Sequence, residues 1–307
     1  MLKRKDLLEI KSLSEDEILS ILHTAKQMKE KIDNSSLRSD ELKNKSVVTL
    51  FYENSTRTKM SFMLASDYLG AKPEDLGIAT SSVNKGESLV DTGVTLDNMG
   101  IDAMVIRHSL TGASHLLAKN VKACVINAGD GSNEHPTQAL LDVYSIIEQK
   151  GKIEGLNVAI IGDIANSRVA RSNIFALSKL GANVTLAGPS TLVGKNMETL
   201  AKNVKVVNDI SEGIKNADVI MGLRVQFERQ KKMPFPNTSE YHKFFGLTKD
   251  MLHLAKDDVT IMHPGPINRG VELSTDVIEL ENAIINEQVK NGVVVRMAIL
   301  KLLLQNR

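Results

Sequence analysis

The sequence predicts an α/β fold of two domains, each a parallel β-sheet flanked by helices, with the active site in the cleft between them. Short apolar runs alternate with longer segments of helical spacing along most of the chain, a pattern typical of parallel sheets. The length of 307 residues fits two domains of the usual ~100–200 residues. A loop-rich stretch at 127–135 separates two rounds of the pattern, so we expect one sheet on either side of it.

The first domain is predicted over residues 1–132, completed by a C-terminal segment, 287–307, that holds a helix at Val289–Leu304. Its strands are expected in three apolar runs: Ser46–Phe51, Ile101–Ile106 and Val121–Asn127. Apolar residues at helical spacing, with a glycine after the last turn, predict helices at Lys59–Leu69 and Ser88–Met99.

The second domain is predicted over residues 133–286. Pro136 is expected at the first position of a helix, Thr137–Lys150, because the first turn does not need the missing N–H of proline. A further helix is expected at Arg168–Leu180. Strands are expected at Leu156–Ile161, Asn183–Ala187, Val204–Asn208, Asp218–Gly222 and Val259–Met262. Parallel sheets bind ligands beyond the carboxyl ends of their strands, and these ends are where candidate residues are sought.

The composition excludes several classes of protein. Lys and Arg number 38 and Asp and Glu 37, a formal charge of +1, so no basic surface for nucleic acid or anionic membranes is indicated. No apolar run reaches ~18 residues, and the basic start Met1–Asp6 lacks the apolar stretch of a secretory signal. The single Cys124 excludes intrachain disulfides and multi-cysteine metal sites, and a buried inert thiol is expected there. A cytoplasmic enzyme or binding protein is therefore expected.

The segment Ser55–Thr58 lies between a predicted strand and a predicted helix, where free N–H groups favour an anion. Its hydroxyls could serve only as helix caps. However, Arg57 and Lys59 do not fit that alternative, because cations near a helix N-terminus are disfavoured by ~0.3–1 kcal/mol unless an anion binds there. The residues predict a phosphate cradle, and the GxxxxGK[ST] pattern of a P-loop is absent.

Four arginines follow apolar runs: Arg57, Arg107, Arg168 and Arg224. Arginine binds carboxylates and phosphates through two hydrogen bonds at once, whereas lysine serves a solvated surface equally well. Arg168 and Arg224 suit a dicarboxylate, which with the phosphate cradle indicates transfer between two anions. Four unrelated surface arginines are the alternative.

Two further candidates precede helices. His135 can polarise a carbonyl group, with Gln138 one turn along, although a helix cap or an ordinary surface histidine is the commoner role. Lys85 lies in a polar stretch, Ser81–Ser88, and could swing over an anion, with a solvated loop as an equal alternative. The segment Gly162–Arg168 lacks G-x-G-x-x-G, so NAD binding is poorly supported, and hydrolase and metal-ligand motifs are absent.

Seven motifs then give a resemblance that covers the whole chain. They are FYENSTRT, SSVNKGES, VIRH, NAGDGSNEHPTQALLD, IGDIANSRVARS, LRVQFER and HPGPINRGVE, and their order resembles the aspartate/ornithine carbamoyltransferase superfamily. Ornithine enzymes carry His-Cys-Leu-Pro and Ser-Met-Gly where this chain has His263–Pro266 and Arg224–Gln226. The resemblance is therefore to the aspartate branch, since Arg224 suits a second carboxylate and would repel the ammonium of ornithine.

The resemblance implies the roles of individual residues. A carbamoyl phosphate site is implied at Ser55, Thr56, Arg57, Thr58, Arg107, His135, Gln138 and the backbone of Gly265 and Pro266. Aspartate binding is implied for Lys85, Arg168, Arg224 and Gln226, and catalysis for Arg57, Thr58, His135 and Lys85. The family often has leucine where this chain has Gly265, a change that a backbone contact survives.

The resemblance also implies a reaction and an assembly. Carbamoyl phosphate and L-aspartate would give N-carbamoyl-L-aspartate and phosphate, a step of pyrimidine (UMP) biosynthesis that needs no metal or cofactor. A homotrimer is implied, in which Ser81 and Lys85 enter the neighbouring active site, and Glu53 would pair on closure with Arg168 and Arg229. A regulatory chain or a dihydroorotase as partner is left open, although HPGPINRGVE resembles the branch that works as an unregulated trimer. A carbamoyltransferase for another amino acid and a non-catalytic homologue are the alternatives.

Overall fold

The computed structural model describes residues 2–34, 38–226 and 237–305. The chain forms two compact units, the first made of Met1–Tyr144 and Val289–Arg307 and the second of Ser145–Gln288. The first unit reaches past residue 132, where the sequence predicts a boundary. The loop-rich stretch 127–135 is mostly buried and consists of the end of a strand and the turn that precedes a helix.

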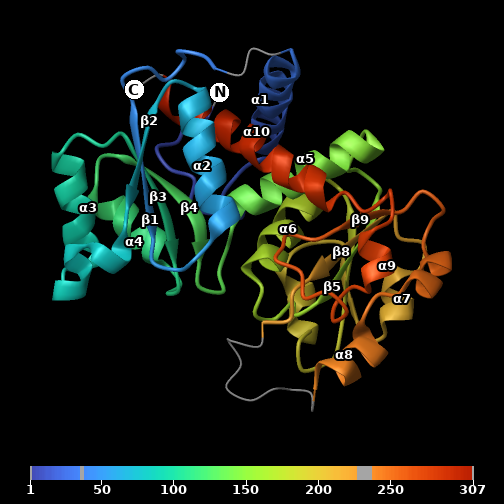
Figure 1. The fold of residues 1–307 in the computed structure, drawn as a ribbon. Coiled ribbons are helices and arrows are strands. Elements are labelled where there is room, and N and C mark those ends of the chain that lie inside the picture. Colours follow the sequence, from blue (N-terminus) through green and yellow to red (C-terminus); the bar gives the residue numbers. More distant parts are fainter. Residues whose placement is uncertain (1, 35–37, 227–236, 306–307) are drawn as a thin grey trace. The chain divides into compact units, whose positions relative to one another are not determined.

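A four-stranded parallel sheet forms the centre of the first unit, in the order β2-β1-β3-β4 (Figure 1). The strands are β1 (Ser46–Phe51), β2 (Lys72–Leu76), β3 (Ala103–His108) and β4 (Cys124–Asp130). The helices of this part of the chain are α1 (Glu15–Asp33), α2 (Thr56–Tyr68), α3 (Leu89–Asn98), α4 (Ala113–Asn120), α5 (Pro136–Lys150) and α10 (Ile285–Leu304). The last turns of α5 and the first of α10 belong to the second unit.

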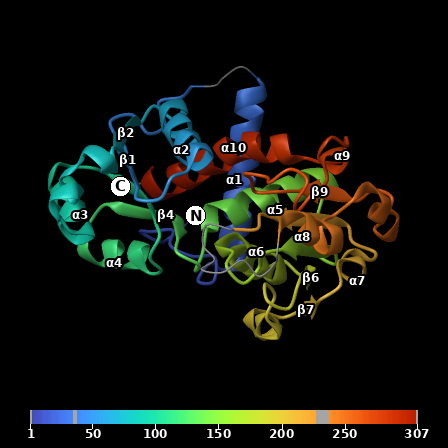
Figure 2. The ribbon, with the colours of Figure 1, turned by 60° about the horizontal axis from the view of Figure 1, so that its bottom comes forward.

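Helices cover both faces of this sheet. α3 and α4 lie side by side on one face, and α2 lies on the other (Figures 1 and 2). Alternate strand residues face α3 and α4 and pack with them in one apolar cluster, which includes Val48, Leu50, Met104, Ile106, Val125, Leu117 and the partly buried Leu96. Cys124 is buried, as predicted.

Partly buried charges connect the two ends of the chain within the first unit. Glu41 forms an ion pair with Lys31 of α1, and its other oxygen lies 2.6 Å from Nζ of Lys301 on α10. Burial alone would raise the pKa of this carboxyl, but its hydrogen bonds with the two lysines outweigh burial and lower the pKa below 4.5. The C-terminal helix is thereby tied to the N-terminal part of the chain.

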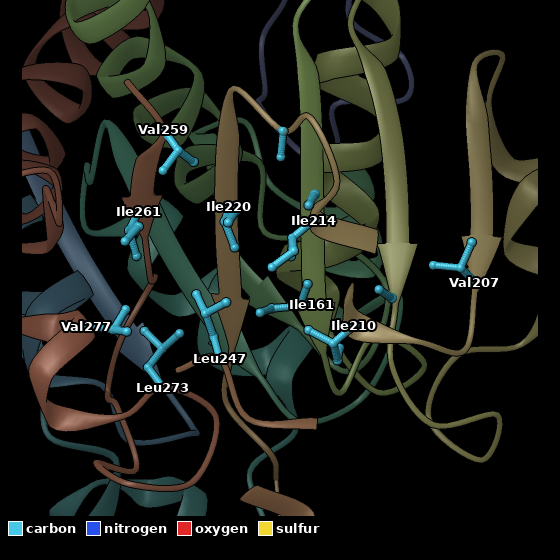
Figure 3. Close-up of a cluster of buried hydrophobic side chains, with 13 residues drawn as sticks. Ile161, Val207, Ile210, Ile214, Ile220, Leu247, Val259, Ile261, Leu273 and Val277 are labelled. Carbon is cyan, nitrogen blue, oxygen red and sulfur yellow. The ribbon is translucent and has the colours of Figure 1, made fainter. Parts of the chain in front are cut away.

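The second unit is built on a five-stranded parallel sheet in the order β7-β6-β5-β8-β9. The strands are β5 (Asn157–Gly162), β6 (Asn183–Ala187), β7 (Val204–Val207), β8 (Val219–Leu223) and β9 (Thr260–Met262). Its further helices are α6 (Arg168–Lys179), α7 (Ile210–Ile214), α8 (Thr238–Phe245) and α9 (Thr275–Ile278). Figure 3 shows the apolar cluster on one sheet face, where Ile161, Ile220 and Ile261 of three strands meet Ile214 of α7 and Val277 of α9.

The predicted class, two parallel sheets flanked by helices, is confirmed. No helix in the described parts of the chain is long and apolar enough to cross a membrane.

Candidate active site

In each sheet, the chain runs from two neighbouring central strands toward opposite edges of the sheet. In the first unit these strands are β1 and β3, and in the second they are β5 and β8. Ligands of parallel α/β sheets bind at such switch points, beyond the carboxyl ends of the strands. The candidate residues lie there: Ser55–Thr58 follow β1, Arg107 is on β3, Arg168 follows β5 and Arg224 follows β8.

The predicted phosphate cradle forms the start of α2. The helix begins at Thr56, earlier than the predicted Lys59, so Arg57 and Thr58 stand in its first turn. Ser55 has the extended backbone of a cap residue, but its side chain makes no capping hydrogen bond, and the first turn holds no acidic residue. Capping alone therefore does not explain this sequence. The arrangement leaves a helix N-terminus with a positive field and an exposed arginine.

Lys59, used with Arg57 to argue for a bound anion, has another partner. Its Nζ lies 2.7 Å from Oδ2 of Asp75, and Thr49 donates a hydrogen bond of 2.7 Å to Oδ1 of the same carboxylate. Asp75 is on β2, so this ion pair ties the helix to the edge strand. Lys59 therefore has a partner within the first unit, and the charge argument for a bound anion depends on Arg57.

Arg107 stands opposite Phe51 in the sheet and so lies beside the segment that leads from β1 to α2. Its Nη2 is 3.2 Å from Oε1 of Glu53, and its Nη1 donates to the carbonyl oxygen of Ala128 at 3.3 Å. These contacts hold the guanidinium at the switch point. Arg229, the other residue that the resemblance pairs with Glu53, lies outside the described residues.

His135 is buried directly before α5, with Pro136 at the first helical position as predicted. Its carbonyl oxygen accepts hydrogen bonds from the N–H groups of Gln138 and Ala139. The preceding Glu134 is anchored by the backbone N–H groups of Ile10 and Lys11, at 2.7 and 3.1 Å. The N-terminal segment thus fixes the loop that carries His135, a contact that sequence reasoning missed because its partners are far apart in the chain.

The polar stretch that carries Ser81 and Lys85 follows the edge strand β2. It forms two short 3-10 turns, Ile78–Thr80 and Ser82–Lys85, and Gly86 ends the second with a φ of 93°. Lys85 is exposed, and the hydroxyl of Ser81 donates to the carbonyl oxygen of Ile78 at 2.9 Å. The stretch is therefore a folded surface loop.

In the second unit, loops after β5 and β8 are joined by Asp163. This fully buried carboxylate accepts from the backbone N–H of Gln226 at 3.3 Å and from the amide of Asn166 at 3.0 Å. Gln226 also donates to the carbonyl oxygen of Asn166 at 3.4 Å. Arg168 is buried at the first position of α6, which Ser167 caps through the N–H of Ala170.

A second buried carboxylate, Glu272, organises the turn after β9. Its Oε1 accepts from the N–H of Asn268 at 2.6 Å and lies 3.3 Å from Nε2 of His263. His263 Nδ1 accepts from the N–H of Gly265 at 2.8 Å, so its proton belongs on Nε2, facing Glu272. Gly265 has a φ of 63°, a left-handed conformation that favours glycine.

Asn268 extends this arrangement to Arg224. Its side-chain oxygen accepts from Nε of Arg224 at 3.4 Å, while its amide donates to the carbonyl oxygen of Val225 at 3.2 Å.

Burial, and then the nearby charges of Glu272 and Asp163, raise the pKa of the Tyr241 phenol, so this group stays neutral. Sequence reasoning missed three residues of this arrangement, Asp163, Glu272 and Asn268. Asp163 and Glu272 are acids within otherwise apolar or turn-forming motifs, which is the signal that could have indicated them.

The described residues hold no cluster of three or more His, Cys, Asp or Glu side chains placed to bind a metal ion. What they do hold is two sets of cationic and polar groups, one at the switch point of each sheet. Such a pair of sites defines a protein that handles two small anions.

Comparisons with known proteins agree with this class. Residues 5–148 match the family described as aspartate/ornithine carbamoyltransferase, carbamoyl-P binding domain, and residues 154–303 match its Asp/Orn binding domain. An aspartate carbamoyltransferase catalytic subunit of Acetivibrio thermocellus is 58% identical over 303 residues, which cover 99% of this chain and 96% of that protein. The chain belongs to the aspartate/ornithine carbamoyltransferase family.

Two solved structures illustrate the shared fold. Aspartate transcarbamoylase from Trypanosoma cruzi, in complex with carbamoyl aspartate and phosphate, has a TM-score of 0.88 at 31% identity, over 98% of this chain and 96% of that one. Ornithine carbamoyltransferase from Pyrococcus furiosus also has a TM-score of 0.88 at 31% identity, over 98% and 97% of the two chains. The fold alone therefore does not choose between the two amino acids.

Proposed function

We propose that this chain transfers the carbamoyl group of carbamoyl phosphate to the α-amine of L-aspartate, giving N-carbamoyl-L-aspartate and phosphate. The observation that carries the choice of aspartate is the pair Arg168 and Arg224 on the two sides of the β5/β8 switch point. Two guanidinium groups there suit the two carboxylates of aspartate and oppose the side-chain ammonium of ornithine. Relatives between 48% and 58% identical, named aspartate carbamoyltransferase catalytic subunit, support the same choice.

In this proposal the first unit binds carbamoyl phosphate. The hydroxyl groups, N–H groups and arginine of Ser55–Thr58 hold the phosphate, with Arg107 reaching it from β3. His135 and Gln138 hold the carbamoyl group.

The reaction is a substitution at the carbamoyl carbon. The deprotonated amine of aspartate attacks this carbon, a C–N bond forms, and the bond to the phosphate oxygen breaks. Arg57, Thr58 and His135 stabilise the negative charge on the carbonyl oxygen, and Arg57 also stabilises the departing phosphate. The phosphate takes the amine proton, so no separate base is required. Lys85 and the other cations offset the repulsion between two anions held at reacting distance.

The assembly and cellular role follow the same proposal. Lys85, with Ser81, acts in the active site of a neighbouring subunit of a homotrimer, which fits its exposed position on a surface loop. The enzyme is cytoplasmic and works in pyrimidine biosynthesis, with or without a regulatory chain or a dihydroorotase.

Replacing Arg224 tests the aspartate site. Arg224→Ala should raise KM for aspartate at least tenfold (about 1.4 kcal/mol of binding) and leave KM for carbamoyl phosphate nearly unchanged. The side chain is partly buried and contacts Asn268, so Arg224→Lys serves as a control that keeps the charge. Equal weakening of both substrates by Arg224→Ala would contradict the assignment.

A further inference from the structure

A buried carboxylate lies behind Gln138. Nε2 of Gln138 donates a hydrogen bond of 2.9 Å to Oδ1 of Asp142, one turn further along α5. Asp142 is fully buried, and Gln138 is nearly so. Residues four apart on a helix share one face, so this contact is built into the helix itself.

The chemistry of the pair fixes which way the Gln138 amide points. An ionised carboxylate only accepts hydrogen bonds, whereas a glutamine amide has one end that donates and one that accepts. Asp142 must therefore be met by the NH2 group of Gln138. The carbonyl oxygen is then the group that Gln138 presents away from Asp142, which makes the side chain an acceptor.

Arg296 is a buried cation whose charge interacts with that of Asp142. This arginine on α10 is only 3% exposed. Burial lowers its pKa to about 10, although the charge of Asp142 opposes the shift, and at neutral pH it remains a cation. The hydrogen bond from Nε2 of Gln138 is one that a carboxylate oxygen accepts.

The surroundings of Arg296 fit its guanidinium. Its Cζ lies 5.2 Å from the centre of the Phe62 ring on α2, a cation–π contact. One turn earlier on α10, a Cβ at Gly292 would lie 2.6 Å from Nη1 of Arg296, so glycine makes room for the arginine. The same helix α2 carries the predicted phosphate cradle at its start. Arg296 thus packs against the helix that begins with the predicted cradle.

We propose that Asp142 is a positioning residue that makes Gln138 an acceptor and so selects a carbamoyl group over an acyl group of the same size. The inference rests on the proposed function, in which Gln138 contacts the carbamoyl group. The NH2 of a carbamoyl group can donate to the Gln138 oxygen, and the methyl of an acetyl group cannot. A site built to pair with a hydrogen-bonding group rejects an analogue that lacks it.

Two stable analogues of carbamoyl phosphate test this inference directly. Phosphonoacetamide carries the NH2 group, and 2-oxopropylphosphonate carries a methyl in its place. Their dissociation constants are measured by calorimetry, and the ratio of the two constants reports the selection for NH2. Loss of stability or general damage to the site weakens both analogues and leaves that ratio unchanged.

The variant removes both charges of the pair. Asp142→Asn alone leaves Arg296 buried without its countercharge, which is strongly destabilising. We therefore combine Asp142→Asn with Arg296→Met, because an apolar replacement of a buried ion pair is often tolerated. The amide that replaces the Asp142 carboxylate can either donate or accept, so Gln138 is free to turn. Gln138→Met, which lacks the acceptor, gives the value expected when selection is lost.

The expected result is a preference of about tenfold for phosphonoacetamide in the wild type, as one hydrogen bond would give. The double variant should approach the ratio of Gln138→Met and bind 2-oxopropylphosphonate as the wild type does. A wild-type ratio in the double variant, or equal weakening of both analogues, overturns the positioning role. Equal affinity of the wild type for both analogues instead contradicts the proposed contact of Gln138 and so the site on which the inference rests.

Discussion

Arg57 is the residue whose replacement tests the phosphate cradle most clearly. Its side chain is exposed in the first turn of α2, and no acidic residue shares that turn. Truncation of an exposed side chain changes the free energy of unfolding by less than about 0.5 kcal/mol. Removing a cation from a helix N-terminus even favours the helix by ~0.3–1 kcal/mol. Arg57→Ala should therefore fold at least as well as the wild type.

The loss of activity should be far larger than the change in stability. Arg57 is proposed to stabilise charge on both the carbonyl oxygen and the departing phosphate. Removing one such electrostatic group costs ~10²–10³ in turnover, or about 2.7–4 kcal/mol in the barrier. We expect kcat to fall by this factor while the thermal unfolding midpoint stays within experimental error of the wild type or rises.

Lys59→Ala is the matched control. It removes the same charge two residues further along α2, but Lys59 forms an ion pair with Asp75 in which the side chains are 30% and 32% exposed. Such surface pairs contribute ~0–1 kcal/mol, and the pair lies outside the proposed cradle. Colorimetric measurement of the ureido product, with carbamoyl phosphate and aspartate both varied, gives kcat and both KM values. Near wild-type turnover in Arg57→Ala, or an equal loss in Lys59→Ala, would refute the reasoning.

Three further predictions concern assembly, the turn after β9 and acid stability. Chains with Arg57→Ala and chains with Lys85→Ala should each be inactive alone and should regain activity when they are mixed. In random mixed trimers, roughly a quarter of the shared sites keep both Arg57 and Lys85. Verified mixed trimers that stay inactive would argue against shared sites. Glu272→Ala should lower the unfolding temperature and raise KM for aspartate, because buried donors that lose an acceptor cost about 1–3 kcal/mol each. Glu272→Gln keeps an acceptor oxygen and should have smaller effects. Equal effects of both substitutions would contradict the role of that oxygen. The lowered pKa of Glu41 stabilises the fold at pH values above 4.5 and ceases to do so as pH falls through the folded-state pKa. The stability difference between wild type and Glu41→Gln, measured by urea unfolding, should therefore shrink below pH 4.5, and a constant difference would oppose this view.

Strands of the parallel sheets were the most predictable part of the fold. The run Asn183–Ala187 was predicted to the residue as β6, and β1 likewise, because buried parallel strands are short apolar runs with clear ends. The edge strand β2 was missed, since its sequence KPEDL is polar and contains a proline, which only an edge position tolerates. α1 was also missed, although Ser14 and Glu17 form a capping box that marks its start.

Several residues proposed to touch substrate could be found from the sequence because they lie at the end of a strand or a few residues after it. Arg57, Arg107, Arg168 and Arg224 all lie at the strand ends where parallel sheets bind ligands. The residues behind them could not be found this way. Asp142 is on α5 and Arg296 is on α10, far apart in the sequence, so sequence spacing carries no sign of their charge interaction.

The central claim is that the residues at the two switch points accept carbamoyl phosphate and aspartate. Its most direct test is a ureido-product assay on the wild-type chain with carbamoyl phosphate, in which aspartate and ornithine are supplied in parallel. Product is expected with aspartate alone. Product with ornithine, or with neither amino acid, would contradict the roles given to Arg224 and Gln226.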